Sequence, residues 1–387
     1  MHHRLYDAAM SSVSPAPLEN WPTWRAENGA PAPRRVVAAD DTLSADVAYR
    51  LACEGTGLLW QGDFHNARQL LQALARRTER KPKKVKKPEP IVTPAQAFHL
   101  HRQALGQRAR VLGMVLVPLN GDYTIPLRRA PDLTQACTEA WGSATGEACM
   151  VSLRELLGLV GAHEWRKKGV EIPALGESNN RIHPHYGVFS PVRGEYVDLV
   201  ANTPIKDKSL AFDIGVGTGV LSAVLAQRGI KHIVATDQDP RALACARDNL
   251  QRLQCLDRIE LVQTDLFPEG QAPLVVCNPP WVPARPSSPI EHAVYDEGSR
   301  MLRGFLNGLR AHLTPEGEGW LILSDLAEHL GLRTRDELMG WISEAGLQVQ
   351  GRHDIQPRHG KASDASDSLH AARAKEVTSL WRLTAAA

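Results

Sequence analysis

The stretch Ala211-Phe212-Asp213-Ile214-Gly215-Val216-Gly217-Thr218-Gly219-Val220-Leu221 decides the fold of this chain. The apolar run Leu210–Ile214 predicts a buried strand, and the apolar spacing in Val220–Gln227 predicts a helix. Between them lies a turn with three glycines, Gly215, Gly217 and Gly219. Glycine lets a backbone approach a ligand that a Cβ would exclude. With a carboxylate at the strand end, Asp213, the turn is expected to bind a nucleotide-type ligand.

The spacing of these glycines disfavours a dinucleotide site. The dinucleotide fingerprint G-x-G-x-x-G needs glycine where this chain has Val220 or Ser222. A nicotinamide-dependent oxidoreductase is therefore not the favoured function. The pattern that is present reads D-x-G-x-G-x-G.

Three further strands are expected after the glycine turn, and a polar motif follows each one. They are His232–Thr236 before Asp237, Arg258–Gln263 before Asp265, and Leu274–Cys277 before Asn278-Pro279-Pro280-Trp281. Ligands bind at the carboxyl ends of strands in open parallel sheets, so these segments are expected to converge on one cleft. Asp237 is placed to accept hydrogen bonds from ribose hydroxyls.

The ordered set of a glycine turn, two acids and N-P-P-W resembles the class I S-adenosylmethionine-dependent methyltransferases, within their small-domain group of N-methyltransferases. The resemblance covers residues 181–387. It implies an α/β fold with a seven-stranded Rossmann-like sheet, mostly parallel with an antiparallel last strand, behind a mainly helical N-terminal extension. It implies S-adenosyl-L-methionine as the cofactor, bound by Asp213, Gly215, Gly217, Gly219, Asp237, Asp265 and Asn278. In the family, an acid at the position of Asp265 binds the adenine amino group, and Tyr or Phe usually stands at the position of Trp281.

The N-P-P-W loop is expected to be catalytic through Asn278, Pro279, Pro280 and Trp281. A planar NH2 group is a poor nucleophile, and oxygens that accept both its hydrogens stabilise the transition state. The side-chain carbonyl of Asn278 and the backbone carbonyl of Pro279 are the expected acceptors, on a loop that two prolines rigidify. Trp281 offers a flat face for stacking.

Structural roles compete with these functional ones. Asn278 and Asp265 are also typical turn residues, and Trp281 is also a typical loop anchor. Asp239, two residues after Asp237, is expected to cap the helix Arg241–Leu253. His183 and His185 lack a partner at metal-ligand spacing and are expected to be ordinary loop residues.

The acceptor is expected to be a macromolecule. In the family, N-P-P-aromatic enzymes methylate amino groups of nucleobases in RNA or DNA, or a glutamine amide in a protein. The basic segment RRTERKPKKVKKPEP at 76–90 favours nucleic acid, because Lys and Arg contacts to phosphate add affinity. A protein-glutamine N5-methyltransferase is the alternative, and a non-catalytic cofactor-binding module is a weaker one.

Composition excludes several other classes. Hydrophobic residues make up 43% of 387 residues and charged ones 23%, as in an ordinary globular chain, and the formal net charge of +2 does not by itself call for nucleic acid. The six cysteines contain no C-x-x-C pair, which argues against a metal site or a disulfide framework. No apolar run is long enough to span a bilayer, so no membrane partner is expected. The N-terminus lacks the apolar stretch of a signal peptide, and a cytoplasmic location is expected.

Three segments are expected along the chain. Residues 1–90 are expected to be helical or irregular and to end in the basic linker, with residues 11–39 irregular. Residues 91–180 are expected to form an accessory substrate-recognition region with one strand at Val111–Val117, and residues 181–387 the methyltransferase domain. The loop after Trp281, Val282–Glu297, is expected to be a lid or an acceptor wall.

Overall fold

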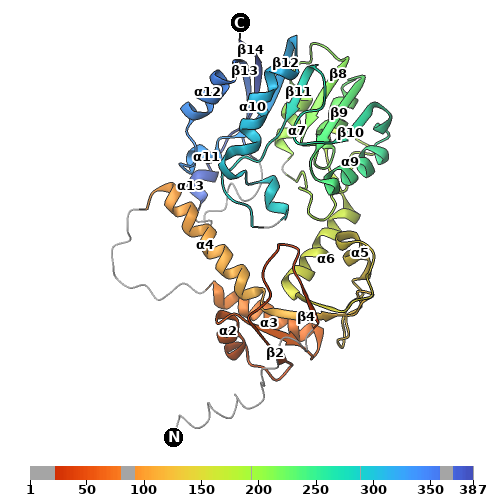
Figure 1. Cartoon of the computed structure of the whole chain (residues 1–387), viewed down its shortest axis with the longest axis vertical. Coiled ribbons are helices and arrows are strands. Elements are labelled where there is room, and N and C mark those ends of the chain that lie inside the picture. The colour runs from red at the N-terminus through yellow and green to blue at the C-terminus, as the bar shows by residue number, and fades with distance from the viewer. Residues whose placement is uncertain (1–21, 80–91, 193, 288, 358–368, 387) are drawn as a thin grey trace. The chain divides into compact units, whose positions relative to one another are not determined.

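The computed structural model describes residues 22–79, 92–192, 194–287, 289–357 and 369–386. The glycine turn directly follows β8 (Leu210–Ile214), a central strand of a seven-stranded sheet (Figure 1). The chain forms two compact units, residues 1–91 with 100–164, and residues 92–99 with 165–387. The second unit contains all of the predicted site residues and is called the catalytic unit below. Its seven strands are β8, β9 (His232–Asp237), β10 (Ile259–Gln263), β11 (Ala272–Cys277), β12 (Leu313–Ser324), β13 (Leu347–Ile355) and β14 (Thr378–Ala385).

The strand order is β10-β9-β8-β11-β12-β14-β13. Strands β8 to β12 pair in parallel, and β14 runs antiparallel to both of its neighbours. The mostly parallel sheet with an antiparallel last strand is therefore confirmed, and β8 has the bounds that the apolar run predicted.

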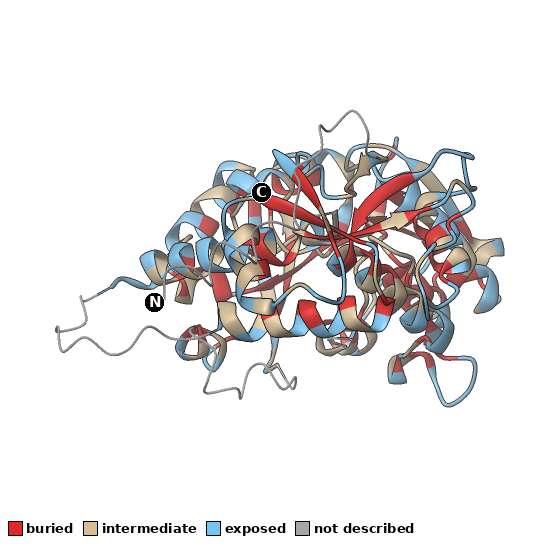
Figure 2. Cartoon of the chain, turned by 90° about the horizontal axis from the view of Figure 1, so that it is seen from below, coloured by how far each residue is buried: buried red, intermediate tan, exposed pale blue. Residues whose placement is uncertain are grey.

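Helices cover both faces of this sheet. Alternate strand residues form two apolar clusters, one packed against α7 (Glu195–Asn202), α8 (Val220–Gln227) and α9 (Pro240–Arg252), the other against α10 (Arg300–His312) and α12 (Arg335–Glu344). Buried strands between helices with exposed outer surfaces are visible in Figure 2. This unit also contains α11 (Leu326–His329), α13 (His370–Arg373), the hairpin strands β6 (Val170–Glu171) and β7 (Arg181–Ile182), and short 3-10 helices.

The N-terminal unit combines the expected helices with a second sheet. Its strands β1 (Thr23–Arg25), β2 (Arg35–Ala39), β3 (Thr56–Trp60), β4 (Val115–Leu119) and β5 (Cys149–Ser152) lie in the order β1-β5-β4-β3-β2. The helices are α2 (Ala45–Cys53), α3 (Phe64–Thr78), α4 (Pro94–Leu112), α5 (Thr134–Trp141) and α6 (Leu153–Lys168), of which α4 and α6 also extend into the catalytic unit.

Two local expectations for this unit are wrong. Within residues 22–39, which were expected to be irregular, Thr23–Arg25 and Arg35–Ala39 form the strands β1 and β2 and pair with other strands. The strand expected at Val111–Val117 begins later, at Val115, because α4 continues through Leu112. Both expected N-terminal segments, 1–90 and 91–180, contribute strands to this one sheet. Of the basic linker, residues 80–91 lie outside the described residues.

Among the described residues, no helix has the length and apolar character needed to cross a membrane.

Candidate active site

The four strands expected to carry the site lie next to one another. Parallel pairing puts Ile214 beside Cys277 on β11 and beside Thr236 on β9, and Asp237 beside Gln263 on β10. The residues that follow each strand therefore lie at the same edge of the sheet. The glycine turn is at the centre, with Asn278 on one side and Asp237 and Asp265 on the other.

The glycine turn is closely packed except at Gly217. Gly217 has φ +52° and a Cβ built there meets nothing within 4 Å, whereas a Cβ on Gly215 would lie 2.7 Å from Cε of Met301. The N–H groups of Gly215 and Val216 both donate to the carbonyl of Thr236, at 2.9 and 2.8 Å. The backbone at Gly217 therefore borders open space, as a site for a closely approaching ligand requires.

Asp213 lies beneath the turn, with 1% of its surface exposed. Its Oδ2 accepts a hydrogen bond from Ser222 Oγ at 2.6 Å. Burial raises the pKa of Asp213 to about 6, although the hydrogen bond from Ser222 opposes this shift and the charge of Asp237 adds to it. This carboxylate is placed to shape the turn from below, and sequence reasoning missed its partner Ser222.

Asp237 is only partly buried, and both of its oxygens bind backbone amides. Gly217 N–H donates to Oδ2 at 3.1 Å and Asp239 N–H donates to Oδ1 at 3.0 Å. Burial raises the pKa of Asp237, and these backbone hydrogen bonds oppose the shift. The predicted cap is confirmed, because the Asp239 side chain accepts from Arg241 N–H at 2.8 Å at the start of α9.

Asp265 is exposed and lies in an ion pair. Its carboxylate oxygens lie 3.4 and 3.5 Å from the guanidinium nitrogens of Arg300, the first residue of α10. Both side chains are more than half exposed, so the pair is solvated and weak. Sequence reasoning did not anticipate Arg300.

The N-P-P-W loop contains an internal hydrogen bond. The indole Nε1 of Trp281 donates to Oδ1 of Asn278 at 2.9 Å. Trp281 is half-buried and packs against three apolar clusters, so it also anchors the loop. Because an amide oxygen has two lone pairs, Oδ1 of Asn278 can accept one more hydrogen bond.

The segment after Trp281 folds back on the loop. Val282 accepts from Asp296 N–H at 2.9 Å and donates to the carbonyl of Val294 at 3.1 Å. Asp296 is 7% exposed, and its carboxylate accepts from the N–H groups of Met301 and Leu302 at the start of α10. Burial raises the pKa of Asp296, and those backbone hydrogen bonds oppose it. Asp296 thus links the end of this segment to Val282 and to α10. The sequence predicts a lid or an acceptor wall at Val282–Glu297 and does not single out Asp296.

Another missed residue, Asn249 of α9, joins the lead-in segment to the glycine turn. Its side chain is fully buried, and Nδ2 donates to the carbonyls of Thr218 and His183 at 3.1 and 3.2 Å. Its Oδ1 accepts from His183 N–H at 2.7 Å. The histidines of the lead-in have other partners, since His183 Nδ1 lies 2.6 Å from the carbonyl of Arg166 and His185 Nε2 lies 3.0 Å from Asp248. Within the described residues, no cluster of three or more metal-ligating side chains is present.

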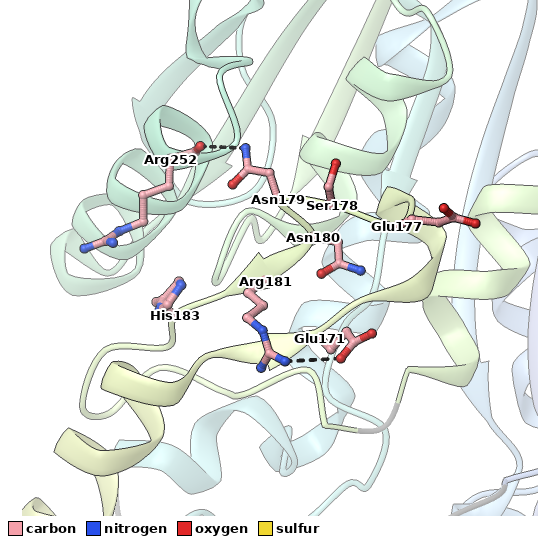
Figure 3. A pocket seen from close by; sticks show the side chains of 8 residues that line it. All are labelled: Glu171, Glu177, Ser178, Asn179, Asn180, Arg181, His183 and Arg252. Atoms are coloured by element: carbon pink, nitrogen blue, oxygen red, sulfur yellow. Dashed lines mark hydrogen bonds and ion pairs between the residues drawn. The ribbon is translucent and has the colours of Figure 1, made fainter.

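A polar cavity lies elsewhere on the catalytic unit and contains none of the predicted site residues (Figure 3). It has a volume of about 560 Å³ beside the β6–β7 hairpin and the end of α9. The side chains that line it are Glu171, Glu177, Ser178, Asn179, Asn180, Arg181, His183 and Arg252. Among them, Arg181 pairs with Glu171, and Asn179 donates to the carbonyl of Arg252.

Comparison with known proteins identifies the family. Residues 179–334 match the family model described as methyltransferase small domain. The tRNA1(Val) (adenine(37)-N6)-methyltransferase of Shewanella loihica is 30% identical over 183 residues, which cover 44% of this chain and 72% of that protein. The chain belongs to the small-domain methyltransferase family. It is a methyltransferase that uses S-adenosylmethionine as the methyl donor.

Other relatives differ in the acceptor that their names give. The release factor glutamine methyltransferase of Cereibacter sphaeroides is 31% identical over 170 residues, which cover 40% of this chain and 58% of that protein. Among solved structures, a methyltransferase from Pyrococcus furiosus shares 18% identity with a TM-score of 0.38, covering 58% of this chain and 98% of that chain.

Proposed function

We propose that this methyltransferase transfers the methyl group to an exocyclic amino nitrogen of a nucleobase in RNA or DNA. The observation that carries the proposal is the hydrogen bond from Trp281 Nε1 to Asn278 Oδ1 at the edge beside the glycine turn. This hydrogen bond holds the side-chain amide of Asn278 in one orientation. One lone pair of its oxygen accepts from Trp281, and the other can accept a hydrogen from the NH2 group that is methylated.

The residues proposed to bind the methyl donor lie in the glycine turn and at the ends of the neighbouring strands. S-adenosylmethionine, when bound, supplies an electrophilic methyl group on a sulfonium. Open space at Gly217 and the partly exposed carboxylate of Asp237 beside it fit a nucleoside that approaches the backbone closely. Asp213 supports the turn from beneath, and Asp265 is proposed to leave Arg300 for the adenine amino group.

Asn278 and Pro279 are proposed to act on the acceptor. Their carbonyl oxygens accept the two hydrogens of the planar amine and increase electron density on nitrogen as it becomes tetrahedral. Positioning supplies the rest, because displacement at a methyl group depends on alignment more than on acid or base groups. Trp281 and Pro280 hold the loop in shape.

Nucleic acid is favoured over protein for two reasons. The enzyme from Shewanella loihica, which is 30% identical to this chain over 183 residues, is named as an adenine-N6 methyltransferase of tRNA. The segment 76–90 contains eight basic and two acidic side chains, which favours a polyanionic partner. We propose that the N-terminal unit, which contains this segment, contributes to acceptor recognition.

A protein glutamine is the second candidate, because its amide is also planar and the Cereibacter sphaeroides relative carries that activity in its name. The test is to incubate the enzyme and methyl-labelled S-adenosylmethionine with RNA, DNA and protein from a deletion strain. We expect label in nucleic acid, released as an N-methylated nucleoside on digestion, and none with Asn278→Ala. Label recovered only as N5-methylglutamine would replace the first proposal with the second.

A further inference from the structure

Helix α4 begins inside the catalytic unit, although most of its length belongs to the N-terminal unit. Its start is fixed by a reciprocal capping box. Gln96 N–H donates to Thr93 Oγ1 at 3.2 Å, and Thr93 N–H donates to Gln96 Oε1 at 3.0 Å. Pro94 at the first helical position suits the same start. The first turns of α4 are therefore specified by the sequence to form at this place.

Phe98 on this part of α4 is 3% exposed and belongs to a small apolar cluster of the catalytic unit. The other buried members of that cluster are Val282, Leu326, Leu330, Leu369 and Ala372. Its ring also lies 6.4 Å, between centroids, from the ring of Tyr295. Among the described residues, Phe98 is the one aromatic member of the buried set, and the partly buried rings of Trp281 and Tyr295 pack against the cluster.

The cluster contacts the N-P-P-W loop and the segment after it through Val282 and Tyr295. Val282 directly follows Trp281 in the chain, and Trp281 itself packs against the cluster. Tyr295 pairs with Val282 in a backbone bridge, and the next residue, Asp296, donates to the carbonyl of Val282. Phe98 therefore packs in the cluster that supports both sides of the bridge between Val282 and Tyr295. This bridged segment directly follows Asn278 and Trp281 in the chain.

We propose that Phe98 is a positioning residue for methyl transfer. It acts through Val282 and Tyr295, and its role rests on the proposed function of the Asn278–Trp281 loop. A smaller side chain would leave a void that the surrounding segment fills by moving. Val216 of the glycine turn and Val220 and Leu221 directly after it pack in a separate cluster, so cofactor binding should not follow that movement.

The test compares Phe98→Ala with Phe98→Leu, which keeps a large apolar side chain, and with Leu338→Ala as a matched control. Leu338 is 1% exposed in α12 and belongs to a different cluster of the catalytic unit. We expect Phe98→Ala to lower kcat about 10- to 100-fold with the dissociation constant of S-adenosylmethionine unchanged. Phe98→Leu should recover most of kcat, and Leu338→Ala should lower the melting temperature with little effect on kcat.

Hydrogen exchange gives a second readout that does not depend on the acceptor. In Phe98→Ala, exchange should accelerate at the amides of Val282 and Asp296 and stay unchanged at Gly215 and Val216. Unchanged exchange in the loop, or a kcat loss in Leu338→Ala as large as in Phe98→Ala, would overturn the role of Phe98. The kinetic measurement uses whichever of the RNA, DNA or protein fractions the wild-type enzyme methylates. If the proposed acceptor class is wrong, the wild type reveals this by itself. The hydrogen-exchange result remains a test of Phe98 in that case.

Discussion

Replacing Asp213 by asparagine should stabilise the protein at neutral pH. The pKa of Asp213 is about 6 in the folded protein, against an ordinary value of 3.8, because the carboxyl is buried. At 1.36 kcal/mol for each pKa unit, keeping this group ionised costs about 3 kcal/mol above pH 6. Asparagine has the same shape, carries no charge and keeps an oxygen for Ser222.

The pH dependence of this effect has a defined sign. Between pH 3.8 and 6 the unfolded chain loses the Asp213 proton while the folded protein keeps it. Stability of the wild type therefore falls with rising pH through this window, and the variant lacks that contribution. The advantage of Asp213→Asn should reach about 3 kcal/mol at pH 7.5 and about half of that at pH 5, relative to its value well below pH 3.8.

Urea unfolding of both proteins at several pH values between 5 and 8 measures this difference, and other titrating groups cancel in it. Ser222→Ala is the matched control with the opposite sign, because it removes a hydrogen bond that favours the ionised form. A difference that stays flat from pH 5 to 7.5, or an asparagine variant that is less stable at pH 7.5, would refute the buried-charge interpretation.

Three further substitutions test the rest of the site. Asn278→Ala should lower kcat about 10²- to 10³-fold with the cofactor dissociation constant unchanged, measured by methyl transfer and calorimetry; full activity would exclude its role in holding the acceptor. Gly217→Val should weaken cofactor binding and destabilise the fold by about 1–2 kcal/mol, since φ is +52° there and the side chain would fill the open space; wild-type affinity in calorimetry would mean that the ligand does not approach this backbone. Asn249→Ala should cost about 1–3 kcal/mol in urea unfolding by leaving buried carbonyls unpaired, and should raise the KM for S-adenosylmethionine; a stability loss with an unchanged KM would limit Asn249 to a structural role.

The catalytic unit could be read from the sequence because its determinants are local. Each parallel strand is a short apolar run, and β8 with its glycine turn is unambiguous once the spacing is known. Since strand order brings the carboxyl ends together, residues such as Asp237 and Asn278 could be assigned to one edge before any contact was seen.

The N-terminal sheet could not be read in the same way. All five residues of β3, Thr56–Trp60, are buried, so no alternation of apolar and polar residues marks it as a strand. The strand β1 has three residues, and it pairs with β5 more than a hundred residues later. Ser222, Asn249, Asp296 and Phe98 were missed for a related reason, because their roles depend on tertiary contacts that no local pattern encodes.

The three acids proposed to lie at the cofactor site differ in burial, and this difference favours separate roles for them. Asp213 is 1% exposed and already has a hydrogen-bond partner in Ser222, so it is suited to shaping the turn rather than to direct contact with a ligand. Asp237 is intermediate, and backbone amides hold its carboxylate in one orientation beside the open space at Gly217. The side chain of Asp265 is 58% exposed, and binding a ligand there would break its solvated ion pair with Arg300. Because a weak surface ion pair costs little to break, Asp265 can exchange its partner for a ligand amino group, whereas Asp213 cannot do so without unpairing Ser222 in the core.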